Sequence, residues 1–302
     1  MKKVLIYALA LVGYCAAANA QSIIDADDQR DPNDFYEKFI VKGKKALPLP
    51  DPRESDVVWE ERVWREIHFN EKFNQFFYFP TDENKQTQGR INLVNLIVNA
   101  VKNGDIPTYE DDDMLREYDV AEAMKHLFGE ARTKKIALTD ADGQPIYDPE
   151  TDEVMMKDTV IDATFNNESA TRIQLKERWY IDKQDTRQKV RIVGLMFHYK
   201  KVMEGEGGQD READAESFWI PMDDMRVRQV LVNANVYDEH NDALEMSYDD
   251  IFLQRKFDSY VVRKSNTYNR SVSDYLTGID AILESQNIED EIFEIESDMW
   301  EY

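Results

Sequence analysis

Apolar residues recur every four positions near the start of the chain. In residues 53–77, Trp59, Val63 and Ile67 have this spacing, and charged residues occupy most positions between them. One apolar stripe beside a charged face predicts an amphipathic helix. Pro80 follows this segment, and we expect the helix to end before it because the residue preceding a proline disfavours the helical conformation.

Two further helices are predicted before the middle of the chain. Residues 89–103 place apolar side chains on one face, and Gly104 is expected to stop the helix, since glycine readily adopts the left-handed conformation found there. Residues 120–128 predict a shorter helix. The connector between them, residues 106–114, contains four successive acidic residues.

The middle of the chain has a β-type pattern. Residues 173–181 and 190–202 are rich in β-branched and aromatic residues and flank a polar, turn-sized segment, which predicts a long antiparallel hairpin. Turn residues within 136–157 predict shorter hairpins. Residues 203–217 are expected to form a polar loop. The elements predicted next are a strand at 218–221, a helix at 222–230 that starts at Asp223 and Asp224, and a strand at 231–237.

The C-terminal third predicts helices again. One begins at Ser247 and runs to about Phe257. A second begins at Ser271, where Asp274 three positions later forms a capping-box pattern. Its apolar stripe is interrupted at Asn287 and then continues at helical spacing. The stripe comprises Val272, Tyr275, Leu276, Ile279, Ile282 and Leu283, followed by Ile288, Ile292, Ile295 and Met299. Helices from both ends around a central antiparallel sheet predict an α+β fold, with residues 57–302 as a single domain.

The first 56 residues are expected to lie outside this domain. Residues 1–20 have a basic start, an apolar run and an A-x-A site ending at Ala20, the pattern of a secretory signal peptide. Cleavage there removes Cys15, the only cysteine, and leaves no disulfide. Residues 21–56 are acidic and then proline-rich, which favours an extended arm. The arm is either a semi-rigid linker or a segment that lies on a neighbouring subunit.

The charge of the chain excludes some classes of partner. It has 61 acidic and 37 basic residues, a net charge of -24, and removing Lys2 and Lys3 with the signal peptide changes it to -26. Binding to nucleic acid or to anionic lipid relies on lysine and arginine, so neither is expected. No segment of the processed chain is long and apolar enough to span a membrane. We therefore expect an exported protein that reaches a membrane only through partners.

Motifs for catalysis or metal binding are missing from the sequence. The four histidines have no metal-ligand spacing, and no phosphate-binding glycine loop or nucleophile elbow occurs. Asp140 to Gly143 resembles part of a calcium loop but lacks the ligands at both ends of that motif. The acidic run from Glu110 to Asp113 is interpreted mainly as a solvated face. No cofactor, metal or catalytic residue is predicted.

Aromatic residues are the best candidates for protein contacts. Trp59 and Phe77 are expected in the core, whereas tryptophan and tyrosine near a chain end suit an interface. The candidate partner-binding residues are Trp64, Phe76, Tyr268, Arg270, Trp300 and Tyr302.

Two parts of the chain resemble the GldN/PorN family of gliding motility proteins of Bacteroidota. The first carries VWEERVWREI at 58–67, EKFN at 71–74 and YFP at 78–80; the second carries RKSNTYNR at 263–270, DYLTG at 274–278, LES at 283–285 and DMWEY at 298–302. The resemblance covers most of the processed chain and is most specific in its C-terminal third. His68 and Phe69 depart from the Asp-Leu-like pair expected there, so no family role is assigned to His68.

The resemblance implies a non-enzymatic periplasmic component of the type IX secretion system. Family members associate with one another and with the lipoprotein GldK/PorK in a ring at the inner face of the outer membrane. They also contact the GldM/PorM-like and GldL/PorL-like trunk proteins, and the system supports protein export and gliding. The strong negative charge makes copies of the chain repel one another unless a basic surface of a partner, or cations, offset it, and we therefore expect a complementary, less acidic face on the lipoprotein partner. Their affinity is then expected to fall as ionic strength rises.

Two other functions remain open from the residues alone. One is a periplasmic binding module that holds a polysaccharide or an exported client protein with exposed aromatics. The other is an acidic hydrolase, since paired carboxylates occur throughout the chain although no particular pair is marked. A ring subunit predicts large particles that contain a lipoprotein, and it predicts that deleting residues 271–302 blocks assembly. A binding module predicts a monomer that binds a glycan or client protein alone. A hydrolase predicts that substituting one aspartate or glutamate abolishes function and leaves assembly intact.

Overall fold

A computed structural model gives the fold of the chain. It describes residues 44–81, 90–128, 132–137, 156–161, 167–204, 210–236, 241 and 246–299. The predicted signal peptide and most of the predicted arm lie outside these residues.

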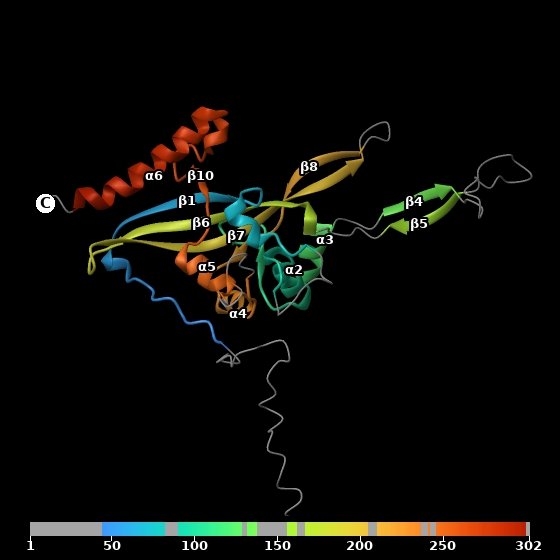
Figure 1. Cartoon of the computed structure of the whole chain (residues 1–302), viewed down its shortest axis with the longest axis horizontal. Helices are drawn as coiled ribbons and strands as arrows, with labels where there is room; N and C mark the ends of the chain where they lie inside the picture. Colours follow the sequence, from blue (N-terminus) through green and yellow to red (C-terminus); the bar gives the residue numbers. More distant parts are fainter. Residues whose placement is uncertain are drawn as a thin grey trace, which may run out of the picture. The chain divides into compact units, whose positions relative to one another are not determined.

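A six-stranded antiparallel sheet forms the centre of the fold (Figure 1). Its order is β10-β1-β6-β7-β8, and the short β9 also pairs with β7. The strands are β1 Val57–His68, β6 Ala170–Asp182, β7 Arg187–Glu204, β8 Asp210–Glu216, β9 Ile220–Pro221 and β10 Tyr260–Lys264. The long β6–β7 hairpin predicted from the sequence is confirmed. The prediction of a polar loop over residues 203–217 is wrong for its second half, because residues 210–216 form the edge strand β8.

The predicted helix at 53–77 is wrong, because its main part is strand β1. A spacing of four is also a multiple of two, so Trp59, Val63 and Ile67 recur along a strand as regularly as along a helix. β1 pairs with β6 from Val57 to His68 and with β10 along its second half. Trp64 lies on the other face of β1 from Val63 and Ile67, and it is also buried because it packs with Met196 and Trp219. The same region contains the short 3-10 helices η2 Glu54–Asp56 and η3 Lys72–Phe77.

The other predicted helices are largely confirmed. The helices are α2 Leu93–Asn103, α3 Val120–Phe128, α4 Met225–Val232, α5 Tyr248–Gln254 and α6 Ile279–Met299. Asn92 caps α2 through a 2.7 Å bond from the Asn95 amide. Gly104 ends α2 with φ of 75°. Ser247 and Asp250 form a capping box at the start of α5.

Two C-terminal predictions need correction. Over residues 231–236, the described part of the strand expected at 231–237, no strand forms: Leu231 and Val232 complete α4, and Asn235 makes only isolated bridges to Arg90 and Ser247. Ser271 does form its capping box with Asp274, but the box starts the 3-10 helix η6 Val272–Asp274, and α6 begins later, after Gly278 with φ of 65°. Asn287 does not interrupt α6.

Small hairpins and one 3-10 helix complete the described elements. β2 Thr108–Tyr109 pairs with β3 Glu117–Tyr118, and β4 Arg132–Ala137 pairs with β5 Met156–Ile161. The 3-10 helix η5 spans Asn167–Ser169. The β4–β5 pairing confirms a hairpin in the region where turn residues predicted one, although those turn residues lie outside the described part.

Two main apolar clusters hold the domain together, beside a small third one of Trp64, Met196 and Trp219. The larger lies between the sheet and helices α2, α4 and α5, and it includes Phe77, as expected. The smaller joins α6 and η6 to β1 and β10, and Trp59 packs at its margin. Figure 1 shows α6 beside β10 and β1, separate from the other helices. The observed architecture is α+β, as the sequence predicts.

Residues 44–52 extend along their own domain. The Ala46 amide donates a 3.1 Å bond to Gln229 of α4, and Arg228 donates to the carbonyl of Leu47. Arg191 of β7 binds the Asp51 carboxylate at 2.8 Å and the Pro50 carbonyl at 3.0 Å. The described end of the predicted arm is therefore fixed by polar contacts within the chain.

Candidate functional site

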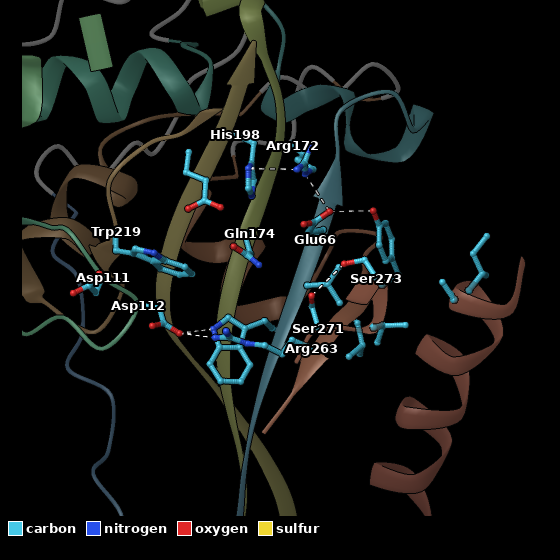
Figure 2. A pocket seen from close by; sticks show the side chains of 18 of the residues that line it. Glu66, Asp111, Asp112, Arg172, Gln174, His198, Trp219, Arg263, Ser271 and Ser273 are labelled. Carbon is cyan, nitrogen blue, oxygen red and sulfur yellow. Dashed lines mark hydrogen bonds and ion pairs between the residues drawn. The ribbon is translucent and has the colours of Figure 1, made fainter. Parts of the chain in front are cut away.

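A groove of about 620 Å³ lies at one face of the sheet, between the β2–β3 connection and the start of α6 (Figure 2). Strands β1, β6, β7 and β10 form its floor. The side chains that define this acidic groove are Trp64, Glu66, Glu110, Asp111, Asp112, Arg172, Gln174, His198, Glu216, Trp219, Tyr260, Arg263 and Ile282. These residues come from seven parts of the chain that are separated in sequence.

Strand register brings the polar side chains of the floor together. Glu66 of β1 pairs with Gln174 of β6, and Arg172 of β6 pairs with His198 of β7. Because cross-strand partners share a face, these side chains project from the same side of the sheet. The result is a row of polar groups on the groove side of this antiparallel sheet, opposite the face that carries the large apolar cluster.

Arg172 is the centre of an ion-pair network on this floor. Its Nε lies 3.1 Å from Glu66 Oε2, and its Nη2 lies 2.6 Å from Asp214 Oδ2 on β8. Nη2 also lies 3.4 Å from Nδ1 of His198, and Figure 2 shows the imidazole turned toward the guanidinium. Tyr260 donates a 3.1 Å bond to Glu66, and it contacts His68. One arginine thus links strands β1, β6, β7 and β8.

This network changes the acidity of its members. Burial alone raises the pKa of Glu66, but the hydrogen bond with His68 and the charge of Arg172 outweigh burial, so the pKa lies below its usual value. Burial and the Arg172 charge both lower the pKa of His198. Arginine can only donate, so Nδ1 of His198 accepts and the proton of the neutral ring is on Nε2. Within the described residues, that buried Nε2 has no hydrogen-bond partner.

The acidic run from Glu110 to Asp113 forms one wall of the groove. Asp112 accepts hydrogen bonds from Trp64 Nε1 at 3.0 Å and from Arg263 Nη2 at 2.6 Å. Lys176 Nζ donates to the Asp112 carbonyl at 2.6 Å and to Asp113 at 3.0 Å. The interpretation of this run as mainly a solvated face is therefore wrong for Asp112, which binds Trp64 and Arg263, whereas Asp113 pairs with Lys176 but stays exposed.

Cations cover the Trp64 ring. The Arg263 guanidinium lies 3.6 Å from the ring centroid, and Lys176 Nζ lies 5.5 Å from it. Such contacts stabilise a cation against an aromatic face. The face of Trp64 that Arg263 covers is therefore closed to a planar or sugar ligand.

The serines of the groove bind each other and a neighbouring carboxylate. Ser271 Oγ lies 3.1 Å from Ser273 Oγ and donates a 2.9 Å bond to Asp274. Neither contact supplies the nucleophile–base pair that acyl transfer requires. Among the described residues, no cluster of three or more histidine, cysteine or acidic side chains has the arrangement of a metal site. What this groove offers is hydrogen bonding and charge recognition.

The predicted partner-binding residues fall in separate places. Trp64 is buried in the wall of the groove, and Phe76 packs against the large apolar cluster. Tyr268 and Arg270 lie together in the connection from β10 to η6, with the guanidinium 4.4 Å from the Tyr268 ring. Tyr268 is 74% exposed. Trp300 and Tyr302 lie outside the described residues.

Most residues of the groove were missed from the sequence. Glu66, Arg172 and His198 are not part of a recognisable sequence motif. The prediction of a helix at 53–77 also placed Glu66 and Trp64 on different faces, whereas strand β1 places them on the same face. The available signal was the alternation of Trp64, Glu66 and His68 with Val63, Arg65 and Ile67, which indicates a strand with two different faces.

Comparison with known proteins identifies the family. None of the described helices has the length and apolar character needed to cross a membrane. No curated protein matches the chain. The family model described as "Gliding motility associated protein GldN" matches residues 52–301. This match covers most of the chain, which therefore belongs to the GldN family of gliding motility proteins.

Proposed function

We propose that this chain is a non-enzymatic structural subunit of the type IX secretion system. It acts in the periplasm, at the inner face of the outer membrane, and assembles with a GldK/PorK-like lipoprotein into a ring. The ring contacts GldM/PorM-like and GldL/PorL-like trunk proteins and supports export and gliding. The observation that carries this proposal is the family match over residues 52–301, which extends across nearly all described elements.

Two features of the described residues support a binding role. Helix α6 exposes Ile279, Ile282, Leu283 and Phe293 at its surface, and exposed apolar clusters mark contact sites. The groove beside it combines carboxylates with aromatic and apolar walls. Both features suit a protein whose function is to bind other proteins.

The binding-module alternative receives less support from the groove. A glycan platform needs an open aromatic face, and Arg263 covers a face of Trp64. Trp219, the other tryptophan of the groove, is only 6% exposed. A module that binds exported client proteins would also work by protein contact. The identity of the bound partner distinguishes this alternative from a ring subunit.

Affinity purification from a detergent-solubilised envelope tests the proposal. The full chain carries a C-terminal tag, and the co-purifying proteins are identified by mass spectrometry at rising salt concentrations. The proposal predicts a lipoprotein in stable amounts relative to the chain, and its recovery falls as salt screens the acidic surface. A chain that purifies alone, or with exported clients and no lipoprotein, contradicts it.

A further inference from the structure

Helix α6 has apolar residues on two opposite faces. At 3.6 residues per turn, positions 279, 282, 283 and 293 fall within about 100° of one another. Ile288 and Ile292 fall on the other side of the helix, and they are 6% and 2% exposed because they pack against β1 and β10. The first set, called here the outer stripe, consists of Ile279, Ile282, Leu283 and Phe293. Ile282 and Phe293 are 67% and 71% exposed.

The inner face of α6 is firmly attached to the sheet. Glu289 forms an ion pair with Arg65, and Lys264 binds Glu291 at 3.0 Å. Gln188 donates a 2.9 Å bond to the carbonyl of Ile292. These contacts fix the orientation of α6, and the outer stripe remains exposed on its other side.

The outer stripe continues into the acidic groove. Ile282 belongs to the stripe and also lines the groove. Figure 2 shows α6 on one side of the sheet floor and Asp111 and Asp112 on the other. Ile282 therefore borders both the outer stripe and the groove, and the exposed acidic side chains lie across the groove from it.

The charge of this area selects the kind of partner. Helix α6 contains eight acidic residues and no lysine or arginine. Across the groove, the exposed Asp111 and Glu216 form no ion pair with a lysine or arginine of the described residues. Unpaired carboxylates beside apolar side chains complement lysine or arginine flanked by apolar residues. A second copy of this chain is a poor occupant, since its net charge is -24.

We propose that the outer stripe of α6 and the acidic groove form one docking surface for a protein segment that carries lysine or arginine beside apolar residues. The apolar side chains of the segment cover Ile282 and its neighbours, and its cations bind Asp111 and Glu216. This inference deepens the proposed structural role and rests on it, because it names the surface through which the chain joins an assembly.

Site-specific photo-crosslinking in cells tests where a partner docks. A photoreactive amino acid replaces Ile282 in one strain and Leu253 in another. Leu253 is a matched control because it is an exposed apolar residue of α5, 50% exposed. We expect an adduct at position 282, with the crosslinked peptide identified by mass spectrometry as one with lysine or arginine beside apolar residues. Adducts at 253 alone, or at 282 with lipid, glycan or another copy of this chain, overturn the inference.

Two double variants measure the energetic role of the surface. I282A/F293A removes apolar area, and Asp111→Asn with Glu216→Gln removes charge. The controls are L253A and Asp105→Asn with Glu122→Gln, which change apolar area or charge at exposed positions outside α6 and the groove. We expect each test variant to lower partner recovery by about tenfold or more, the scale of contact residues that matter for binding. Controls are expected to recover the partner as the wild type does.

The outcomes separate the two proposals. If the wild-type chain is free and monomeric, the structural role itself fails. If the wild type assembles and both double variants assemble equally well, the structural role stands and the docking surface is wrong. Circular dichroism and urea unfolding of each purified variant show whether a loss of recovery comes from misfolding.

Discussion

Trp64 and Asp112 are 48 residues apart in the chain, and the indole Nε1 of Trp64 donates a 3.0 Å hydrogen bond to Asp112 Oδ2. Arg263 binds the same oxygen at 2.6 Å while it lies over the indole ring. The three residues connect the acidic loop to β1 and β10. Together with Lys176, which binds Asp112 and Asp113, they hold a run of mutually repelling carboxylates against the sheet.

Replacing Asp112 by alanine is expected to release this loop. The change leaves the Trp64 N–H without its acceptor, and an unsatisfied buried donor costs about 1–3 kcal/mol. Urea unfolding is expected to show a loss of that size, with faster hydrogen exchange at residues 108–118. Asp111→Ala is the matched control, since Asp111 is exposed, and it should change the free energy of unfolding by less than about 0.5 kcal/mol. Equal effects of the two substitutions contradict the anchoring role.

The buried ion pair between α4 and α5 gives a second prediction. Arg228 binds Asp249 through two bonds of 2.9 and 2.8 Å, and both side chains are nearly inaccessible. R228M leaves Asp249 charged and unpaired in the core, which is expected to cost about 3–5 kcal/mol in urea unfolding. R226M is the control, because Arg226 pairs with Asp224 at an exposed position. A loss below about 1 kcal/mol for R228M would show that water reaches Asp249.

The packing of α6 gives a third prediction from two adjacent residues. Ile292 is 2% exposed and Phe293 is 71% exposed. Truncating a buried isoleucine typically costs about 2–5 kcal/mol, whereas an exposed side chain contributes little to folding. I292A should therefore destabilise the purified chain in urea, and F293A should leave it nearly unchanged. The reverse order would mean that α6 packs through its other face.

His198 predicts a pH dependence of stability. Burial and the Arg172 charge hold its folded-state pKa below the ordinary value of 6.5, while nearby Glu66, Glu216 and Asp214 oppose this only in part. As pH falls below 6.5, the unfolded chain binds more protons than the folded chain, so the free energy of unfolding decreases. The account predicts a shallower decrease for H198Q than for the wild type.

Urea unfolding between about pH 7 and pH 5 measures this difference, since most carboxylates remain ionised in that range. His126 also has a lowered pKa, and its contribution is the same in both proteins. Parallel pH profiles for H198Q and the wild type would exclude His198 as a contributor.

The sequence predicts the parts of the fold that depend on local signals. Gly104 and Ser247 mark helix ends through backbone conformation and capping, and β6 and β7 follow from β-branched and aromatic runs around a turn. These signals act within a few residues, so one sequence suffices to read them.

Strand β1 and the groove depend on information that local patterns lack. The spacing of Trp59, Val63 and Ile67 fits a helix and a strand equally well, and only pairing with β6 and β10 decides between them. Arg172 and His198 meet through register, and Asp112 reaches Trp64 through a loop. The acidic strand β8 looks like a loop in sequence because an edge strand has one partner and carries charges that discourage further pairing.

The size of the native particle tests the central claim most directly. That claim is that the chain works by assembling with other proteins. Mass photometry of the tagged chain, extracted from the envelope in mild detergent, separates an assembly from a free chain of 35.4 kDa or less. The account predicts particles many times heavier than the free chain that contain a lipoprotein. A population at the mass of the single chain under the same conditions would contradict it.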